Sequence, residues 1–338
     1  MTIKIGVGFA ASQPAPQVID AARLAERLGF DVFWVTDSHL IGREALTMLG
    51  ALAVSTSTIE LGPGVSHLAG RHPSVLASSM ATLHELAPGR IRLGIGVGDS
   101  GSNNLGVPRA SMRELEHAVR GIHGLLRGEE APGDTKPLRL SFAPTTGDQV
   151  PIYIAAAGER MQRLAGRIAD GALLSVSPRE LPEAIAHVRE GEREAGKPAG
   201  ATRILLWTTV AVDEDAAIAR AAVRGAVARR AMNTLGRRQQ LAAADSEALT
   251  RLQAVYDTQR HGTTAAYDLA ELVPEDWIDR FAIAGTPEAV RNRIEQAARD
   301  GADEFSMILL GSRPGDRGSP ELLTRFAESV LKPLRAAV

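Results

Sequence analysis

The sequence of 338 residues contains no cysteine, and this absence excludes several kinds of functional site. Disulfide bonds, thiolate zinc sites, iron–sulfur clusters and a cysteine nucleophile all need a residue that the chain lacks. No apolar run approaches the roughly 18 residues of a membrane-spanning helix. Residues 1–5 lead directly into a strand pattern and lack the apolar core and cleavage site of a signal peptide. We therefore expect a cytoplasmic protein with no membrane partner.

Neither sign of charge dominates the chain. The formal net charge is -2, and acidic and basic residues are scattered along the sequence. This distribution lacks the basic patch of a nucleic-acid-binding protein. Hydrophobic residues make up 44% and charged residues 23%, as in an ordinary globular protein with a large core. The composition therefore gives no indication of a nucleic-acid partner.

Short apolar runs alternate with amphipathic runs along most of the chain, which is typical of β/α units. The predicted strands are 3–8, 32–35, 59–65, 91–97, 151–156, 172–176, 204–212 and 303–309. The predicted helices are 18–28, 45–55, 73–86, 112–126, 159–168, 181–194 and 320–334. Eight strands with intervening helices favour a closed (β/α)8 TIM barrel, formed as a single domain by residues 1–338. An open doubly wound sheet is the alternative, and it usually has fewer strands.

One segment between strands seven and eight is far longer than a single crossover helix needs. Residues 214–235 and 243–256 both have helical patterns, and a last crossover helix is predicted to begin at Thr286-Pro287. We expect a helical insertion at about 213–280. In a barrel this insertion lies on the active-site face, as a lid or wall of the pocket. A packing or dimer-contact role is the alternative, and residues 129–150 are predicted to form a second irregular loop.

Polar and small residues follow strands two and three, where a barrel collects its active-site residues. Asp37 and His39 follow strand two and could contact a cofactor or handle a proton. A helix cap or turn is the alternative for such residues. Gly64, before Val65, permits unusual backbone geometry and close approach to a ring, or else a simple strand-end bulge.

Glycines and alanines follow strands four and five. Gly94, Gly96 and Gly98 alternate, but they lie within a strand, and the next helix is predicted to start after Pro108. A dinucleotide-binding motif would instead open directly into a helix, so we interpret these glycines as lowering the bulk inside the barrel. After strand five, residues 155–158 could admit a ring or a phosphate at a helix N-terminus, or allow tight packing.

Hydrolase and metal chemistry have little support in the sequence. The Gly-x-Ser-x-Gly motif of a nucleophile elbow is absent. His39, His67 and His72 could approach one another, but no dense set of carboxylate ligands accompanies them. We therefore predict no metal site.

The ordered set of motifs resembles the luciferase-like flavin and deazaflavin oxidoreductase superfamily, and especially its F420-dependent methylenetetrahydromethanopterin-reductase-like subgroup. The resemblance covers nearly the whole chain. The matching pieces are Phe-Trp-Val-Thr-Asp-Ser-His at 33–39, Leu-Gly-Pro-Gly-Val at 61–65, Arg-His-Pro at 71–73, Leu-His-Glu-Leu-Ala-Pro-Gly-Arg at 83–90, Gly-Ile-Gly-Val-Gly-Asp-Ser at 94–100 and Gly-Thr-Pro-Glu at 285–288.

The resemblance implies a set of site residues. It implies a cis peptide between Gly64 and Val65 that presses on the cofactor ring, and catalytic roles for Asp37 and His39 beside that ring. The implied phosphate end lies at residues 156–158. The implied cofactor-binding residues are Asp37, Gly64, Val65, Ser66, Gly98, Asp99, Ser100, Ala156, Ala157, Gly158 and Val176.

The resemblance also implies a function, with alternatives. The first hypothesis is a coenzyme F420-dependent oxidoreductase that transfers a hydride to or from a small organic substrate. The alternatives are an FMN-dependent monooxygenase that uses reduced flavin and oxygen, and a non-catalytic cofactor-binding barrel. A homodimer through helices two and three and a separate reductase that recycles the cofactor are the expected protein partners. The candidates to line the substrate pocket are Arg43, His67, Trp207 and Tyr256.

Overall fold

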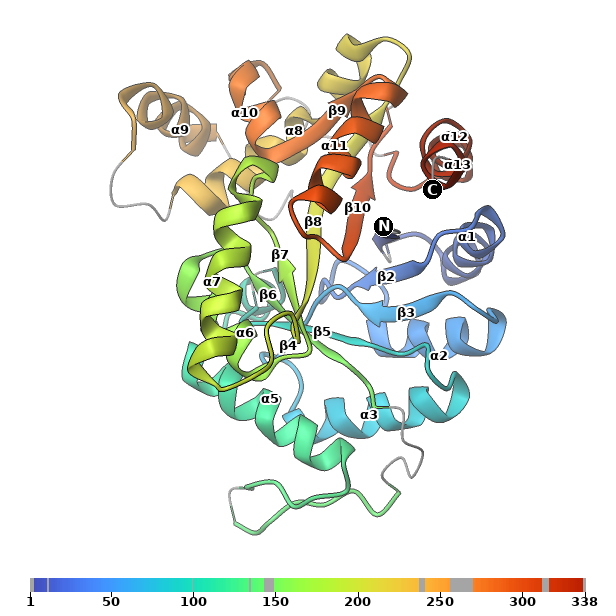
Figure 1. The fold of residues 1–338 in the computed structure, drawn as a ribbon, viewed down its shortest axis with the longest axis vertical. Helices are drawn as coiled ribbons and strands as arrows, with labels where there is room; N and C mark the ends of the chain where they lie inside the picture. The colour runs from blue at the N-terminus through green and yellow to red at the C-terminus, as the bar shows by residue number, and fades with distance from the viewer. Residues whose placement is uncertain are drawn as a thin grey trace.

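The computed structural model describes residues 3–10, 12–98, 100–133, 135–142, 149–236, 241–255, 270–311 and 316–336. Within this part of the chain, parallel strands form a central barrel and helices surround it (Figure 1). The strands are β1 (Lys4–Ala10), β2 (Val32–Thr36), β3 (Glu60–Pro63), β4 (Ser66–His67), β5 (Leu93–Gly96), β6 (Ile152–Ala156), β7 (Gly171–Leu174), β8 (Arg203–Val212), β9 (Ala282–Gly285) and β10 (Glu304–Leu309).

The α-helices follow the strands in the alternation that the sequence predicts. They are α1 (Ala15–Leu28), α2 (Ala45–Ser55), α3 (Pro73–Leu86), α4 (Ser100–Leu105), α5 (Met112–Leu126), α6 (Glu159–Ile168), α7 (Leu181–Glu194), α8 (Ala216–Leu235), α9 (Ala243–Val255), α10 (Glu275–Phe281), α11 (Pro287–Arg299), α12 (Pro320–Phe326) and α13 (Lys332–Ala336). Helices α2, α3, α5, α6 and α7 have the predicted bounds. Local signals explain this agreement: for example, Ser111 and Glu114 form a reciprocal cap at the start of α5.

The barrel closes through strand three, which is split into β3 and β4. The strand order is β3-β2-β1-β10-β8-β7-β6-β5-β4, and the paired strands are parallel. The first half of strand three pairs with β2, and the second half pairs with β5. A bridge between Leu61 and Ile91 joins the two sides near the bottom of the barrel. The predicted TIM barrel is confirmed, but the single strand predicted at 59–65 is wrong because Gly64 and Val65 leave the ladder.

Three further details differ from the sequence prediction. Helix α4 begins at Ser100, so the helix predicted to start after Pro108 is preceded by an earlier one. Strand β9 was not predicted; it pairs with the last four residues of β8, which extend beyond the end of β7. The last predicted helix is divided by a π-helical turn, Ala327–Leu331.

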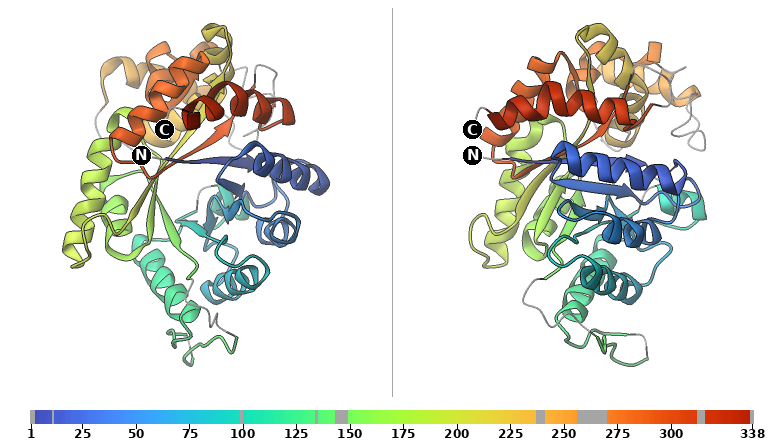
Figure 2. Two further views of the ribbon diagram at one scale, coloured as in Figure 1. Left: turned by 45° about the vertical axis from the view of Figure 1, so that its right-hand side comes forward. Right: turned by 90° about the vertical axis from the view of Figure 1, so that its right-hand side faces the viewer.

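The segment between β8 and β9 contains helices α8, α9 and α10. In Figures 1 and 2 these helices, coloured yellow to orange, gather on one side of the barrel. They share a separate apolar cluster, in which Val223, Leu252 and Trp277 are fully buried. This segment therefore has its own small core beside the barrel.

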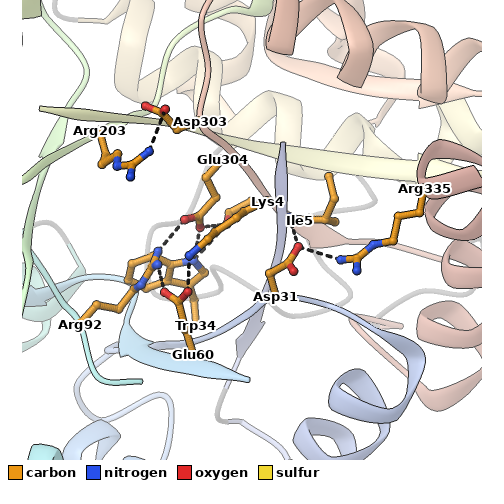
Figure 3. Close-up of polar contacts among 11 residues, drawn as sticks. Lys4, Ile5, Asp31, Trp34, Glu60, Arg92, Arg203, Asp303, Glu304 and Arg335 are labelled. Atoms are coloured by element: carbon orange, nitrogen blue, oxygen red, sulfur yellow. Dashed lines mark hydrogen bonds and ion pairs between the residues drawn. The ribbon is translucent and has the colours of Figure 1, made fainter. Parts of the chain in front are cut away.

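A cluster of charged and aromatic side chains fills the N-terminal end of the barrel (Figure 3). The buried guanidinium of Arg92 pairs with Glu304 at 2.5 Å and also contacts Glu60. It lies 5.3 Å from the ring centroid of Trp34, whose indole N–H donates to Glu304 Oε1 at 3.1 Å. At the bottom of a barrel, away from the active-site face, such a cluster serves stability rather than chemistry. Its consequence for the site is that it fixes the orientation of Trp34.

Candidate functional site

Two tryptophans form a floor beneath the break in strand three. Trp34 and Trp207 pack edge to face, with ring centroids 6.1 Å apart. A Cβ atom added to Gly64 would lie 3.0 Å from Trp207 Cη2 and 3.1 Å from Trp34 Cβ. The peptide bond from Gly64 to Val65 is cis, as the resemblance implies. We call Gly64 and Val65 the bulge. The bulge rests directly on the tryptophan pair, so a side chain larger than that of glycine at position 64 would crowd the two indole rings.

The alternating glycines of β5 make room for the side chain of Val65. A Cβ atom on Gly94 would lie 3.0 Å from one Val65 methyl group, and a Cβ atom on Gly96 would lie 3.3 Å from the other. Gly94 also abuts the carbonyl of Pro63. For Gly94 and Gly96, the interpretation that these glycines lower the bulk inside the barrel is confirmed.

A buried ion pair lies beside the bulge. Ser66 Oγ donates to Asp37 Oδ2 at 2.8 Å, while Arg71 pairs with both oxygens of the same carboxylate. Arg71 also contacts Glu44 at the surface. Burial acts to lower the pKa of Arg71, but its contacts with Asp37 and Glu44 outweigh this and raise the pKa above its ordinary value. Because both Asp37 oxygens are engaged, this carboxylate holds its neighbours in place.

Arg71 is a residue that sequence reasoning did not assign to the site. In the sequence it stands out only as part of the Arg-His-Pro motif at 71–73. The available signal was its position in the loop after strand three, next to the loop that carries Asp37. Adjacent loops at the barrel mouth bring opposite charges together, so an ion pair between them was a reasonable expectation.

His67 is a buried imidazole without a hydrogen-bond partner among the described residues. Its side chain is 3% exposed, and neither ring nitrogen is paired there. The ring lies against Gly101 in α4, because a Cβ atom at Gly101 would collide with His67 Nε2. Burial lowers the pKa of His67, and Arg71 and His39 lower it further against the opposing effect of Asp37. His67 is therefore held neutral at the edge of the site.

The neutral state of His67 predicts a pH effect on stability. Since its pKa is lower in the folded protein than in the unfolded chain, the unfolded chain binds this proton more tightly. Stability is therefore lost as the pH falls below the unfolded pKa of about 6.5. We expect His67→Asn to flatten the pH dependence of the unfolding free energy from pH 6.5 to 5, by up to about 1.4 kcal/mol per pH unit. Denaturant titrations at several pH values measure this slope.

The matched control for this prediction is His117→Asn, because His117 is exposed on α5. Its pH profile should follow that of the wild type. Equal slopes for wild type and His67→Asn would show that His67 does not carry the effect.

The predicted phosphate end lies at the start of α6. Gly158 is the N-cap residue, no side chain caps the helix, and a Cβ atom there would meet nothing within 4 Å. The start of α6, beside Ala156 and Ala157, therefore has no side-chain cap and open space at the Cβ position of Gly158. Val176 follows the neighbouring strand β7, and its carbonyl accepts a hydrogen bond from Arg230 at 2.7 Å.

The other predicted residues are placed as follows. The His39 carbonyl accepts a hydrogen bond at 2.7 Å from the side chain of Asn104, which ties the loop after β2 to α4. Gly98 has a left-handed φ of 88° and packs closely on Ser102. Arg43 donates to the carbonyl of Ser12. Asp99, Tyr256 and the side chain of Ser100 lie outside the described residues.

Fold and site define a (β/α)8 barrel whose candidate site lies at the C-terminal mouth, around a split third strand. The family model described as luciferase-like monooxygenase matches residues 1–304. The chain belongs to this family, and the family resemblance predicted from the motifs is confirmed. Within the described part of the chain, no helix could cross a membrane.

Two curated relatives match almost the whole chain. The 5,10-methylenetetrahydromethanopterin reductase of Methanolobus tindarius is 29% identical over 323 residues, covering 92% of this chain and 94% of the relative. The F420-dependent glucose-6-phosphate dehydrogenase of Beutenbergia cavernae is 31% identical over 357 residues, covering 99% and 98%. The similarity therefore includes the barrel and the segment between β8 and β9.

Solved structures agree with the fold. The coenzyme F420 dependent tetrahydromethanopterin reductase from Methanopyrus kandleri superposes with a TM-score of 0.76 at 24% identity, covering 99% of this chain and 100% of that one. The monooxygenase RslO1 from Streptomyces bottropensis gives a TM-score of 0.68 at 22% identity, covering 98% and 99%. At these identities the likeness concerns the fold alone.

Proposed function

We propose that this protein is a coenzyme F420-dependent oxidoreductase that transfers a hydride between the deazaflavin and a small organic substrate. The observation that carries the proposal is the match over 99% of the chain to a relative named F420-dependent. The barrel fold, with its split third strand at the mouth, agrees with the same assignment. When bound, the deazaflavin supplies or accepts the hydride, and the protein provides binding and orientation.

The residues at the mouth fit such a cofactor. Within the described residues, the ring nitrogens of His67 and the hydroxyl of Ser102 have no hydrogen-bond partner. These atoms would be available for hydrogen bonds to a polar ring. The open N-terminus of α6 at Gly158 suits a phosphate. Gly64 and Val65 would support the ring, since they form the bulge above the tryptophan floor.

Asp37 and His39 would have different roles in this mechanism. Asp37 would position the bulge through Ser66 and Arg71, because all its acceptor atoms are already used. His39 is only partly buried, and no hydrogen bond engages its ring among the described residues. His39 would therefore be the group that moves a proton at the reacting atoms.

Titration of the purified protein with F420 and, separately, with FMN tests this function. We expect F420 to bind with micromolar or tighter affinity and FMN to bind at least about tenfold more weakly, one decade being about 1.4 kcal/mol. In the same titration His39→Ala should retain F420 affinity, while in a separate turnover assay it should lose activity by about 100-fold or more. Preference for FMN would instead indicate a flavin monooxygenase, and binding of neither would indicate a non-catalytic barrel.

The organisation of the whole chain completes the proposal. Residues 1–338 would form one domain, and the insertion at about 213–280 would form a wall of the pocket.

A homodimer would use α2 and α3, where Val54, Val75 and Leu86 are exposed by 69%, 51% and 47%. The mass of the protein in solution tests this, and a monomer would contradict it. The protein would act in the cytoplasm beside a reductase that recycles its cofactor.

A further inference from the structure

The loop that carries His39 is anchored at its two ends. Asp37 lies before it and Glu44 after it, and both carboxylates pair with the guanidinium of Arg71. Between these ends, the Ser38 carbonyl accepts hydrogen bonds at 3.1 and 2.9 Å from two later N–H groups of the same loop. These two bonds close the loop on itself, so they do not fix its middle against the barrel.

One hydrogen bond joins the middle of this loop to another element. Asn104, on α4, donates from its side-chain Nδ2 to the His39 carbonyl at 2.7 Å, across 65 positions of the chain. A backbone carbonyl can only accept, so the amide must present its N–H group here. Within the described part of the chain, no other hydrogen bond or ion pair links residues 38–42 to a different element. The position of the His39 peptide therefore depends on Asn104.

The backbone of Leu40 shows that the shape of this loop is imposed on it. Leu40 has a left-handed φ of 66°, which is a strained conformation for a leucine. Its side chain is 74% exposed, so the packing of Leu40 itself does not stabilise this conformation. Contacts of the flanking peptide groups must stabilise it instead. They are the two bonds to the Ser38 carbonyl and the bond from Asn104 to the peptide group that joins His39 to Leu40.

Helix α4 holds the Asn104 amide in a defined place. Ser102, in this helix, is fully buried, and Gly101 packs on the buried ring of His67. After the helix, the N–H group of Ala110 donates to the Val97 carbonyl at 3.0 Å, which ties the chain back to the end of β5. The donor to the His39 carbonyl is thus mounted on a packed element of the barrel mouth.

We propose that Asn104 is a positioning residue, which holds the His39 peptide so that the imidazole is directed at the reacting atoms. General acid–base catalysis depends on such geometry, and a misplacement of about 1 Å can lower a rate by about 100-fold. This inference rests on the proposed function, because it assumes that His39 moves a proton at this mouth. The competing role for Asn104 is structural, in which the bond stabilises the loop without any effect on the chemistry.

The apoprotein gives a first test that needs neither cofactor nor turnover. The Leu40 N–H belongs to the same peptide group as the His39 carbonyl, so its NMR order parameter reports on this contact. We expect a value of about 0.85 in the wild type and below about 0.6 in Asn104→Ala. Asn104→Asp has the same shape but no N–H donor when ionised, so it should show the same loss. The matched control is Asn103→Ala, because Asn103 is the exposed neighbour on the same helix. It should keep the wild-type value.

Turnover gives the second test, because a purely structural contact would not act through the imidazole. We expect Asn104→Ala to lower kcat about tenfold while the Kd of F420 stays within about twofold of the wild type. In a His39→Ala background, the same substitution should leave kcat unchanged, because the group that Asn104 positions is then absent. Asn103→Ala should leave kcat unchanged in both backgrounds.

Two results would overturn the proposal. Equal order parameters for the Leu40 N–H in the wild type and Asn104→Ala would show that the bond does not hold this peptide. An unchanged kcat in Asn104→Ala, or an equal fractional loss of kcat with and without His39, would show that Asn104 does not act through His39. Failure of the proposed function is distinguishable, because the wild type would then bind no F420, whereas the order parameters are measured in the apoprotein.

Discussion

Replacing Glu304 with glutamine is expected to lower the free energy of unfolding by about 3–5 kcal/mol. The reason is that Glu304 is the buried partner of Arg92, which has a side-chain exposure of only 3%. Glu304 also accepts hydrogen bonds from Trp34 and Ser306, so its charge satisfies three donors at once. Denaturant unfolding, followed by far-ultraviolet circular dichroism, measures the change.

A surface ion pair at the same end of the barrel provides the control. Arg203 and Asp303 are 68% and 36% exposed in their side chains, and Figure 3 shows them close to the buried cluster. Arg203→Gln should therefore change the unfolding free energy by less than about 1 kcal/mol. Similar losses in the two variants would contradict the view that burial makes the Glu304 pair important.

The second large effect is expected on kcat/KM when Asp37 is replaced. Asp37→Asn removes the buried charge that faces Arg71 and weakens the anchor of Ser66, which directly follows the cis peptide. We expect kcat/KM with F420 to fall by about 100-fold or more, which corresponds to about 2.7 kcal/mol of transition-state stabilisation. Steady-state kinetics and F420 titration measure the two components of this loss.

Glu44 offers an unusually close control, because it pairs with the same guanidinium. Its side chain is 46% exposed, while that of Asp37 is 3% exposed. Glu44→Gln should therefore change kcat/KM by less than about fivefold, in keeping with an exposed pair worth up to about 1 kcal/mol. If both variants lost the same activity, the position of the charge beside the bulge would not matter.

The sequence predicted the repeating part of the fold well, since local signals determine it. Pro73 at the first position of α3 and the cap formed by Ser111 and Glu114 fix helix ends within a few residues of chain. The short apolar strands and their spacing then indicate a barrel. Contacts with residues distant in the sequence are not needed to predict these helix ends and strands.

The features that the sequence did not predict depend on contacts between distant residues. The break in strand three requires the strand to pair with β2 before the bulge and with β5 after it. Strand β9 exists because β8 outlasts β7 and offers an unpaired edge. The pairing of Arg92 with Glu304 joins residues 212 positions apart, and periodicity contains no information on such pairs.

The candidate site was predictable in outline for a related reason. Asp37 and Ser66 follow neighbouring strands, and the barrel rule alone brings them to one edge. Their hydrogen bond of 2.8 Å agrees with that expectation. Arg71 and Arg230 enter the site from a loop and from the insertion, where no periodic pattern predicts the direction of a side chain.

The tryptophan floor gives the protein an optical property of its own. The chain has three tryptophans, and two of them, Trp34 and Trp207, lie directly beneath the cis peptide. The third, Trp277, is buried in the insertion next to Phe281. Most of the intrinsic ultraviolet emission therefore originates at the mouth of the barrel and within the segment that borders it. A coloured ring seated on this floor would quench that emission by energy transfer, so occupancy can be followed without attaching any dye.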